Sequence, residues 1–294
     1  MKRADFLKKS LLGAGTLASG AAIAAVVNNQ IDELKPLLAK DQAIGFNHIP
    51  NTNSKMNNNT VLHKADTRGH ANHGWLNARH TFSFANYYNP ERMHFGVLRV
   101  LNDDTIAGGM GFGAHPHDNM EIITIPLEGG VHHKDSMGNS GVISNTEIQV
   151  MSAGTGVQHS EFNSNKDTEL KLLQIWLFPN KGNVTPRYDQ IKRDTTTRNE
   201  FVQILSPSAD DAGVWIHQDA WFNTAKMDEG KELTYNVHKP KTNGVYAFVI
   251  DGDVTINGQS LNRRDGFGIW DVSELKIKAD SNAEILLMEV PMAV

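Results

Sequence analysis

The sequence predicts an all-β fold made of two β-domains, and three observations lead to this prediction. From about residue 61 onward, short apolar runs recur, such as HFGVLRVLNDD, MEIITIPLEGG and AEILLMEV. Gly, Asn, Asp and Pro separate these runs, as is typical of short strands joined by turns. No long stretch of this part has a strong helical period. The polar, irregular stretch from Pro179 to Asp194 indicates a crossover, so we expect domains over residues 60–185 and 186–294.

Composition narrows the kinds of partner that the protein can have. At 294 residues the chain can bury one large core or two ordinary ones. A net charge of −5 and a pI near 6.2 give no basic surface for nucleic acid, so no direct nucleic-acid contact is expected. The absence of cysteine excludes disulfides, thiolate catalysis and cysteine-bound zinc. Most of the 13 histidines lie between His63 and His159, which is where we look for chemistry.

Residues 1–27 have the three regions of a secretory signal. Four basic residues precede a small and apolar run over residues 11–27: Lys2, Arg3, Lys8 and Lys9. Ala22-Ile23-Ala24 provides a small-x-small cleavage site. We expect export to the periplasm by a twin-arginine-like signal whose arginine pair is degenerate, because Ala4 follows Arg3. The alternatives are an uncleaved membrane anchor, which would be the only membrane contact, or an amphipathic helix on a cytoplasmic protein.

Residues 28–59 form a polar linker in this interpretation. The segment ends in NTNSKMNNN and lacks the apolar residues that a packed core needs. We therefore expect a flexible spacer with little packing, apart from a short helix around Ile31 to Lys40.

Two histidines, His115 and His117, flank a proline in the stretch GFGAHPHDNMEI. In a strand, residues i and i+2 point to the same face about 7 Å apart, so both rings could approach one ion. Pro116 lacks an N–H and suits the beginning of a strand or an edge strand. Taken alone, the pair is more often a hydrogen-bonded buried pair than a metal site.

A second pair with the same spacing, His159 and Glu161, occurs in MSAGTGVQHSEFN. Gly154 and Gly156 allow a tight turn just before it. Two facing strands could then bring three imidazoles and one carboxylate to a single ion. The combination of two such pairs favours a metal site, and Glu161 is also our candidate for the catalytic proton acceptor.

Three neutral imidazoles and one carboxylate reduce the charge of a divalent ion to about +1 and leave two open positions on an octahedral ion. Open positions permit Lewis-acid activation of a substrate or binding of a substrate beside O2. The donor set suits Fe(II), Mn, Co, Ni, Cu or Zn. Glu121 follows His117 by four residues, so on a continuous strand it would share the histidine face as a fifth ligand or as a support for one histidine.

These residues fall into patterns that resemble known motifs. The first cupin motif is matched by Gly109, His115, His117 and Glu121, and the second by Gly156, His159 and Asn163. The long block RGHANHGWLNARHTFSFANYYNPERMHFGVLRVLNDD, followed by GFGAHPHDNMEIITIPLEG and AGTGVQHSEFN, resembles the pirin family. Its bacterial branch, which includes quercetin 2,3-dioxygenase-like proteins, is the most similar, and the resemblance covers about residues 60–290.

The resemblance implies two tandem cupin barrels of the jelly-roll kind, with one metal in the N-terminal barrel. That metal is usually iron, so Fe(II) is the expected ion. By motif position its ligands are His115, His117, His159 and Glu161. The family's counterpart of Glu121 is not a direct ligand, so a supporting role remains for it.

The C-terminal barrel keeps a cupin-like turn pattern, GVYAFVIDGDVTINGQSLNRRDG, but has no HxH. Since His217 and His238 are isolated, we expect this barrel to be metal-free.

Other polar and aromatic residues are further candidates for the site. Five residues could form a pocket rim, but polar strand packing is favoured for them: Arg68, His70, His73, Arg79 and His80. Residues 132–136 (HHKDS) indicate a loop near the barrel mouth, with a substrate contact disfavoured. Five aromatic residues are assigned to the core rather than to a stacking platform: Phe82, Phe84, Tyr87, Tyr88 and Phe95. GGMGFG precedes a strand rather than a helix, so it does not indicate dinucleotide binding.

Three functions fit these observations. The first is a pirin-like, quercetinase-type dioxygenase that uses O2 on a flavonol or similar enolisable aromatic, acting as a monomer. The second is a non-enzymatic sensor whose affinity for a partner changes with the redox state of the metal. The third is a cupin isomerase or lyase that uses the ion only as a Lewis acid and needs no O2.

His115→Ala tests the ligand assignment directly. We expect the variant to lose most of the metal that purifies with the parent protein, because one of four donors is removed from a single ion. Metal analysis of both proteins, prepared side by side, measures this. Full metal content in the variant would contradict the assignment.

Overall fold

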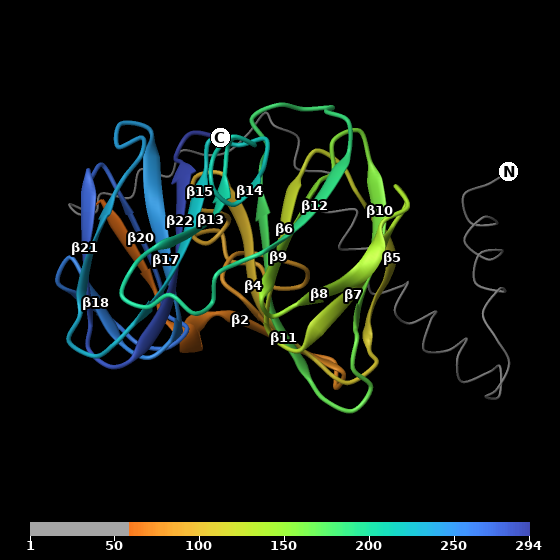
Figure 1. The fold of residues 1–294 in the computed structure, drawn as a ribbon, viewed down its shortest axis with the longest axis horizontal. Coiled ribbons are helices and arrows are strands. Elements are labelled where there is room, and N and C mark those ends of the chain that lie inside the picture. Colours follow the sequence, from red (N-terminus) through yellow and green to blue (C-terminus); the bar gives the residue numbers. More distant parts are fainter. Residues whose placement is uncertain (1–58) are drawn as a thin grey trace, which may run out of the picture. The chain divides into compact units, whose positions relative to one another are not determined.

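The computed structural model describes residues 59–294, and in this range it is built from strands (Figure 1). There are 22 strands and one short 3-10 turn, η2 (Ala65–Thr67), and no α-helix among these residues. The all-β prediction is thus confirmed. The predicted signal over residues 1–27, and the linker over 28–59 apart from its last residue, lie outside the described residues. Within 59–294, no helix has the length and apolarity to cross a membrane.

The first half of this region forms an antiparallel barrel of two sheets, drawn mostly in yellow and green in Figure 1. The larger sheet has the order β12-β9-β6-β11-β4-β3-β2, with bounds β12 (Arg187–Lys192), β9 (Glu147–Ser152), β6 (Glu121–Glu128), β11 (Leu170–Leu177), β4 (Leu98–Ile106), β3 (Leu76–His80) and β2 (Gly69–Asn72). The smaller sheet has the order β5-β10-β7-β8, with bounds β5 (Gly111–His117), β10 (Val157–Asn163), β7 (Gly130–Asp135) and β8 (Ser140–Ser144).

The second half repeats this plan, mostly in teal and blue in Figure 1. Its larger sheet has the order β1-β20-β17-β22-β15-β13-β14, with bounds β1 (Thr60–His63), β20 (Gly266–Trp270), β17 (Asn243–Asp251), β22 (Ala283–Pro291), β15 (Trp221–Met227), β13 (Val202–Ser206) and β14 (Val214–Trp215). Its smaller sheet has the order β16-β21-β18-β19, with bounds β16 (Glu232–Asn236), β21 (Glu274–Ala279), β18 (Val254–Ile256) and β19 (Gln259–Leu261). Two sheets of seven and four strands in each half form the cupin-type double barrel.

Alternation of side chains explains why these segments are strands. In β10, VQHSEFN, every second residue is buried, and in β21, ELKIKA, the charged residues alternate with buried apolar ones. This period of two places one face of each strand on a core and the other toward solvent. β22 and β17 are instead buried almost throughout, because both of their faces are covered.

Two strands pair with the sheet of the other half. β1, orange in Figure 1, pairs with β20 near the C-terminus, with Thr60 opposite Ile269. β12, which follows the expected boundary at residue 185, pairs with β9 of the first barrel. A strand from before the expected boundary, β1, thus completes the larger sheet of the second half, and a strand from just after it, β12, completes that of the first half.

The largest hydrophobic cluster draws on both seven-stranded sheets. Leu101 and Ile123 from the first barrel belong to it together with Phe222, Tyr246 and Met288 from the second. Each barrel also has its own interior cluster. The two large sheets thus share a core, and each covers a smaller sheet on its other side.

The aromatic residues assigned to the core behave differently from one another. Phe82 and Phe95 are buried in the shared core, as predicted. Phe84 and Tyr87 are half-buried, and Tyr88 is exposed, so the core prediction is wrong for Tyr88. Phe84 and Tyr87 pair across a tight turn, which directs the next side chain, that of Tyr88, outward.

Glu121 faces the shared core and not the histidines, which corrects its predicted supporting role. It is only 1 % exposed on β6, where Ile123 on the same face joins the shared core, whereas Thr124 on the opposite face contacts Glu161. The turn at residues 118–120, with Asn119 at φ +45°, ends one strand before the next begins. His117 and Glu121 therefore lie on different strands, and their i, i+4 spacing does not place them on one face.

The Glu121 carboxylate instead joins the two halves. It accepts hydrogen bonds from Ser152 Oγ at 2.8 Å and from the backbone N–H of His217 in the second half. Burial raises its pKa to about 7, although these two hydrogen bonds and the nearby Arg187 act in the opposite direction.

Replacing this buried acid should flatten the pH profile of stability. Because the folded protein keeps a proton on Glu121 that the unfolded chain, with a pKa near 4.5, has released, the free energy of unfolding falls as pH rises from 5 to 7. In Glu121→Gln we expect about 2 kcal/mol of that fall to disappear. Urea unfolding of the metal-free protein at both pH values measures it.

Glu128→Gln, at the exposed end of the same strand, is the matched control and should leave the profile unchanged. An unchanged profile in Glu121→Gln as well would contradict the assignment of this proton to Glu121.

Candidate metal centre

The two predicted pairs lie on neighbouring strands of one sheet. β5 carries His115 and His117, β10 carries His159 and Glu161, and the strands pair antiparallel with His159 directly opposite His115. The sequence predicts that the pairs lie on facing strands. The His115 and His159 rings instead meet as neighbours on paired strands of one sheet. Pro116 sits on β5, an edge strand, as its missing N–H requires.

A β-bulge lies between the cross-strand pair His159–His115 and the next pair, Glu161–Phe112. Beyond the His159–His115 pair, Glu161 lies opposite Phe112, so Gly113 and Ala114 together oppose the single residue Ser160. The bulge turns the Gly113 carbonyl toward His115, whose Nδ1–H donates to it at 2.8 Å. This hydrogen bond fixes the tautomer and leaves the lone pair on Nε2 of His115.

The turn before β10 has the predicted glycine geometry. Gly154 and Gly156 have φ of +47° and +133°, and a Cβ on Gly154 would lie 2.0 Å from the Val184 carbonyl oxygen. Only glycine satisfies both conditions. The tight turn aims β10 so that His159 and Glu161 face the interior of the barrel.

Three imidazoles converge at one point. The ring centroids of His115 and His159 are 4.4 Å apart, and Nε2 of His117 lies 3.1 Å from Nε2 of His159. Two donors at right angles around one ion, each about 2.1 Å from it, would be about 3 Å apart. Within residues 59–294, these three histidines form one of two groups whose donor atoms lie within 4.8 Å of one another.

Electrostatics keep these rings neutral. Burial lowers the pKa of His115, and it lowers the pKa values of His117 and His159 well below the usual range, with the neighbouring rings adding to the effect. A neutral imidazole offers the lone pair that a metal ion needs. The donor set therefore fits a divalent transition metal ion.

Glu161 is buried, as is His159, whereas His115 and His117 are half-buried. Its two carboxylate oxygens accept hydrogen bonds from Thr124 Oγ1 at 2.9 Å and from Gln174 Nε2 at 2.8 Å, both on the opposite sheet. Burial raises its pKa to about 7, against the effect of these two donors. Glu161 is not in the group of His115, His117 and His159; it belongs to the other group, with His133 and His159. The four predicted ligands therefore fall into two sets that share His159.

A row of polar residues crosses the large sheet behind Glu161. In register from one strand to the next they are Gln190, Gln149, Thr124, Gln174, Asn102 and His80. Cross-strand partners share a face, so all six point into the barrel. Sequence reasoning missed this row because each member is a single polar residue in an apolar run.

His80 belongs to this row, which decides between its two predicted roles. It is buried, and its Nδ1 pairs with Asn102 Oδ1 at 2.9 Å. His70 pairs with Asn77 on the adjacent strand of the same hairpin, at the exposed face. Polar strand packing is therefore confirmed for both residues.

Residues 132–135 form part of strand β7 rather than a loop, which corrects a second prediction. His132 is exposed, but His133 is fully buried and lies opposite Glu161 across the sheet. The signal that could have revealed this is the H-x-D spacing of His133 and Asp135, which repeats the i, i+2 pattern of the other pairs.

An aromatic wall borders the histidines. The Trp176 ring is nearly perpendicular to the rings of His117 and Phe84, with ring centroids 4.8 Å and 5.4 Å away. Met120 and Tyr188 pack with Trp176 around a small apolar cluster. A flat apolar ligand would find stacking partners here.

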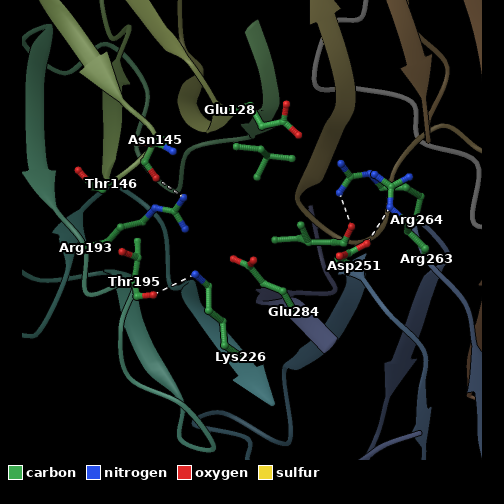
Figure 2. A pocket seen from close by; sticks show the side chains of 12 residues that line it. Glu128, Asn145, Thr146, Arg193, Thr195, Lys226, Asp251, Arg263, Arg264 and Glu284 are labelled. Carbon is green, nitrogen blue, oxygen red and sulfur yellow. Dashed lines mark hydrogen bonds and ion pairs between the residues drawn. The ribbon is translucent and has the colours of Figure 1, made fainter. Parts of the chain in front are cut away.

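A pocket of about 250 Å³ opens between the two halves, away from the histidines (Figure 2). Its charged side chains are largely engaged with protein groups: Arg263 with Asp251, Arg193 with the Asn145 carbonyl and Lys226 with the Thr195 carbonyl. It contains no histidine and no convergent set of metal donors.

The isolated histidines of the second barrel have other partners. His238 stacks on Trp221 at 4.5 Å and its Nδ1 bonds Glu289 at 2.9 Å. His217 packs against Trp215. Both donor groups found among residues 59–294 lie in the first barrel.

Comparison with known proteins agrees with this geometry. Residues 61–177 match the Pirin family model, and residues 203–290 match the model of the quercetinase C-terminal cupin domain. A relative from Escherichia coli K12 named quercetin 2,3-dioxygenase is 46 % identical over 230 residues, covering 78 % of this chain and 98 % of its own length. This chain belongs to the pirin family.

Two further proteins of the comparison are also similar to this chain. A pirin-like protein from Caulobacter vibrioides is 40 % identical over 226 residues, covering 76 % of this chain and 96 % of its own. The crystal structure of a bacterial pirin from E. coli in complex with nickel(II) is 44 % identical with a TM-score of 0.75, covering 80 % of this chain and all of that one. A pirin of this similarity thus binds one of the metals that the present donor set suits.

The support of Glu161 can be tested by Gln174→Met. Removing a hydrogen bond that orients a metal-binding carboxylate typically weakens metal binding 10–100-fold, and we expect a loss of that size. Competition with a chromophoric chelator measures the Kd for Ni(II). Lys171→Met, at the half-exposed beginning of the same strand, is the control and should bind as the parent does. Equal affinity in both variants would contradict a supporting role for Gln174.

Proposed function

We propose that this pirin is a metal-dependent dioxygenase of the quercetinase type, acting on a flavonol or a similar enolisable aromatic with O2. The observation that carries the proposal is the convergence of His115, His117 and His159 beside a buried carboxylate, next to an aromatic wall. The names of the relatives support the reaction class, and the donors support the need for a metal.

The ion that we propose is Fe(II), held by His115, His117 and His159, with Glu161 as the fourth ligand. The histidine nitrogens fit such an ion because they are neutral, close together and fixed by the β5–β10 pairing. Glu161 lies two residues after His159 on the same strand, so it would reach the ion from the same face of β10. A bound divalent ion would supply positive charge that stabilises a substrate oxyanion, and exchange of electrons with O2.

Glu161 also has the properties of a proton acceptor for the substrate. A pKa near 7 matches that of a base working at neutral pH, because such a group is partly deprotonated and still takes up a proton. Thr124 and Gln174 hold its two oxygens, so the carboxylate keeps its orientation whether or not it carries the proton.

The aromatic wall supplies the position for the substrate ring. Trp176 stands beside His117, and Met120 and Tyr188 add apolar surface. Stacking of this kind contributes about 0.5–1.5 kcal/mol beyond area burial. The acidic hydroxyl of an enolisable aromatic would then point toward Glu161.

Oxygen consumption tests the proposal. With the Fe(II)-loaded protein and quercetin we expect O2 uptake and CO release in equal amounts, and a rate about 100-fold lower or less in Glu161→Gln at equal metal content. An oxygen electrode and CO detection measure both gases, and Glu128→Gln serves as the control for a lost surface carboxylate.

Two other outcomes would reject this function. Conversion of a phenol without O2 would favour an isomerase or lyase that uses the ion as a Lewis acid. No turnover with Fe, Mn, Co, Ni, Cu or Zn across a panel of phenols would favour the redox-sensor alternative.

A further inference from the structure

We propose that the first barrel has a second, inner position for a divalent transition metal ion, formed by His133, His159 and Glu161. The donor atoms of these three residues lie within 4.8 Å of one another, and all three side chains are buried. The inner position shares His159 with the outer group of His115 and His117. It concerns metal binding alone and does not depend on dioxygenase activity.

The strand pairing brings His133 to this point. It lies on β7, on the opposite side of β10 from β5, and is the direct cross-strand partner of Glu161. Its ring centroid is 5.5 Å from that of His159, and its side chain is 0 % exposed. β10 is thus flanked by histidine-bearing strands on both sides.

Asp135 fixes the tautomer of His133. Nε2–H of His133 donates to Asp135 Oδ2 at 3.2 Å. The same carboxylate accepts hydrogen bonds from the N–H groups of Met137 and Asn139, at 2.9 Å each, and from Asn139 Nδ2 at 2.8 Å. Such a carboxylate is an acceptor only, so the proton stays on Nε2 and the lone pair on Nδ1.

A carboxylate on the far nitrogen is the arrangement that holds metal-binding histidines in place. For an ordinary core histidine the near nitrogen would also have a partner, but His133 Nδ1 is buried and has none in the protein. His159 Nδ1 is likewise buried without a partner. Buried donors and acceptors of this kind are costly, by about 1–3 kcal/mol each, unless something binds them. A cation beside Glu161 would satisfy these nitrogens.

The two positions exclude each other. A neutral imidazole has one lone pair, so His159, which belongs to both groups, can serve the outer group or the inner group but not both at once. One ion per chain can therefore occupy either place, and Glu161 lies nearer to the inner one. The inner position would bind an added ion more weakly when the outer histidines are lost.

Cobalt(II) binding to the full-length, metal-free chain tests this inference. In the double variant His115→Ala/His117→Ala we expect one Co(II) per chain to bind about 10–1000-fold more weakly than in the parent. Adding His133→Phe, which keeps ring volume beside Tyr188, should weaken this residual binding at least another 10-fold. Equilibrium dialysis with metal analysis gives the stoichiometry and Kd, and the Co(II) absorption bands report the ligands.

The matched control adds His132→Phe, at the exposed neighbour on the same strand, and should leave the double variant unchanged. Circular dichroism and thermal unfolding check that each variant folds, and His133→Leu replaces His133→Phe if the larger ring destabilises the barrel. Two results would overturn the inference: a double variant that binds no Co(II), or residual binding that survives the loss of His133. Neither result bears on turnover of quercetin, so the two proposals fail separately.

Discussion

The antiparallel pairing of β5 with β10 is the constraint on which the site depends. It sets His159 opposite His115, and the bulge at Gly113–Ala114 then lets Glu161 share the inner face with Phe112 on the edge strand. A shift of one residue would turn every donor to the outside. The register is held by backbone hydrogen bonds and by glycines that tolerate no side chain, since a Cβ on Gly111 would lie 2.2 Å from the Glu161 carbonyl.

The two sheets of the first barrel contribute different groups to the site. The small sheet carries the donors, and the large sheet provides the hydrogen bonds that make a buried carboxylate tolerable, from Thr124 and Gln174. The polar row extends this support across the sheet as far as His80. On its other face the same sheet is mostly apolar around Ile123, where the second barrel packs, and the buried Glu121 is hydrogen-bonded there to Ser152. One sheet thus has a polar interior face and a mostly apolar interface.

Sequence patterns predicted what local spacing determines. The period of two gave the strands, the H-x-H and H-x-E pairs, and the glycine turn ahead of His159, since all of these depend on near neighbours in the chain. Glu121 shows the limit: its spacing from His117 would place both on one face only within a single strand, and a turn at Asn119 lies between them. The pairing of β1 with β20 and the position of His133 opposite Glu161 depend on residues far away in the sequence, so local spacing does not predict these partners.

The pairing of β1 with β20 also bears on how the chain reaches its native state. Thr60 and Ile269 are among the most distant partners in the sequence, so the first strand stays without its neighbour until nearly the whole polypeptide is present. Long-range closure of this kind slows folding, because the entropy of a large loop is lost before the contact is gained. The larger sheet of the second barrel is therefore complete only after β1 has paired with β20.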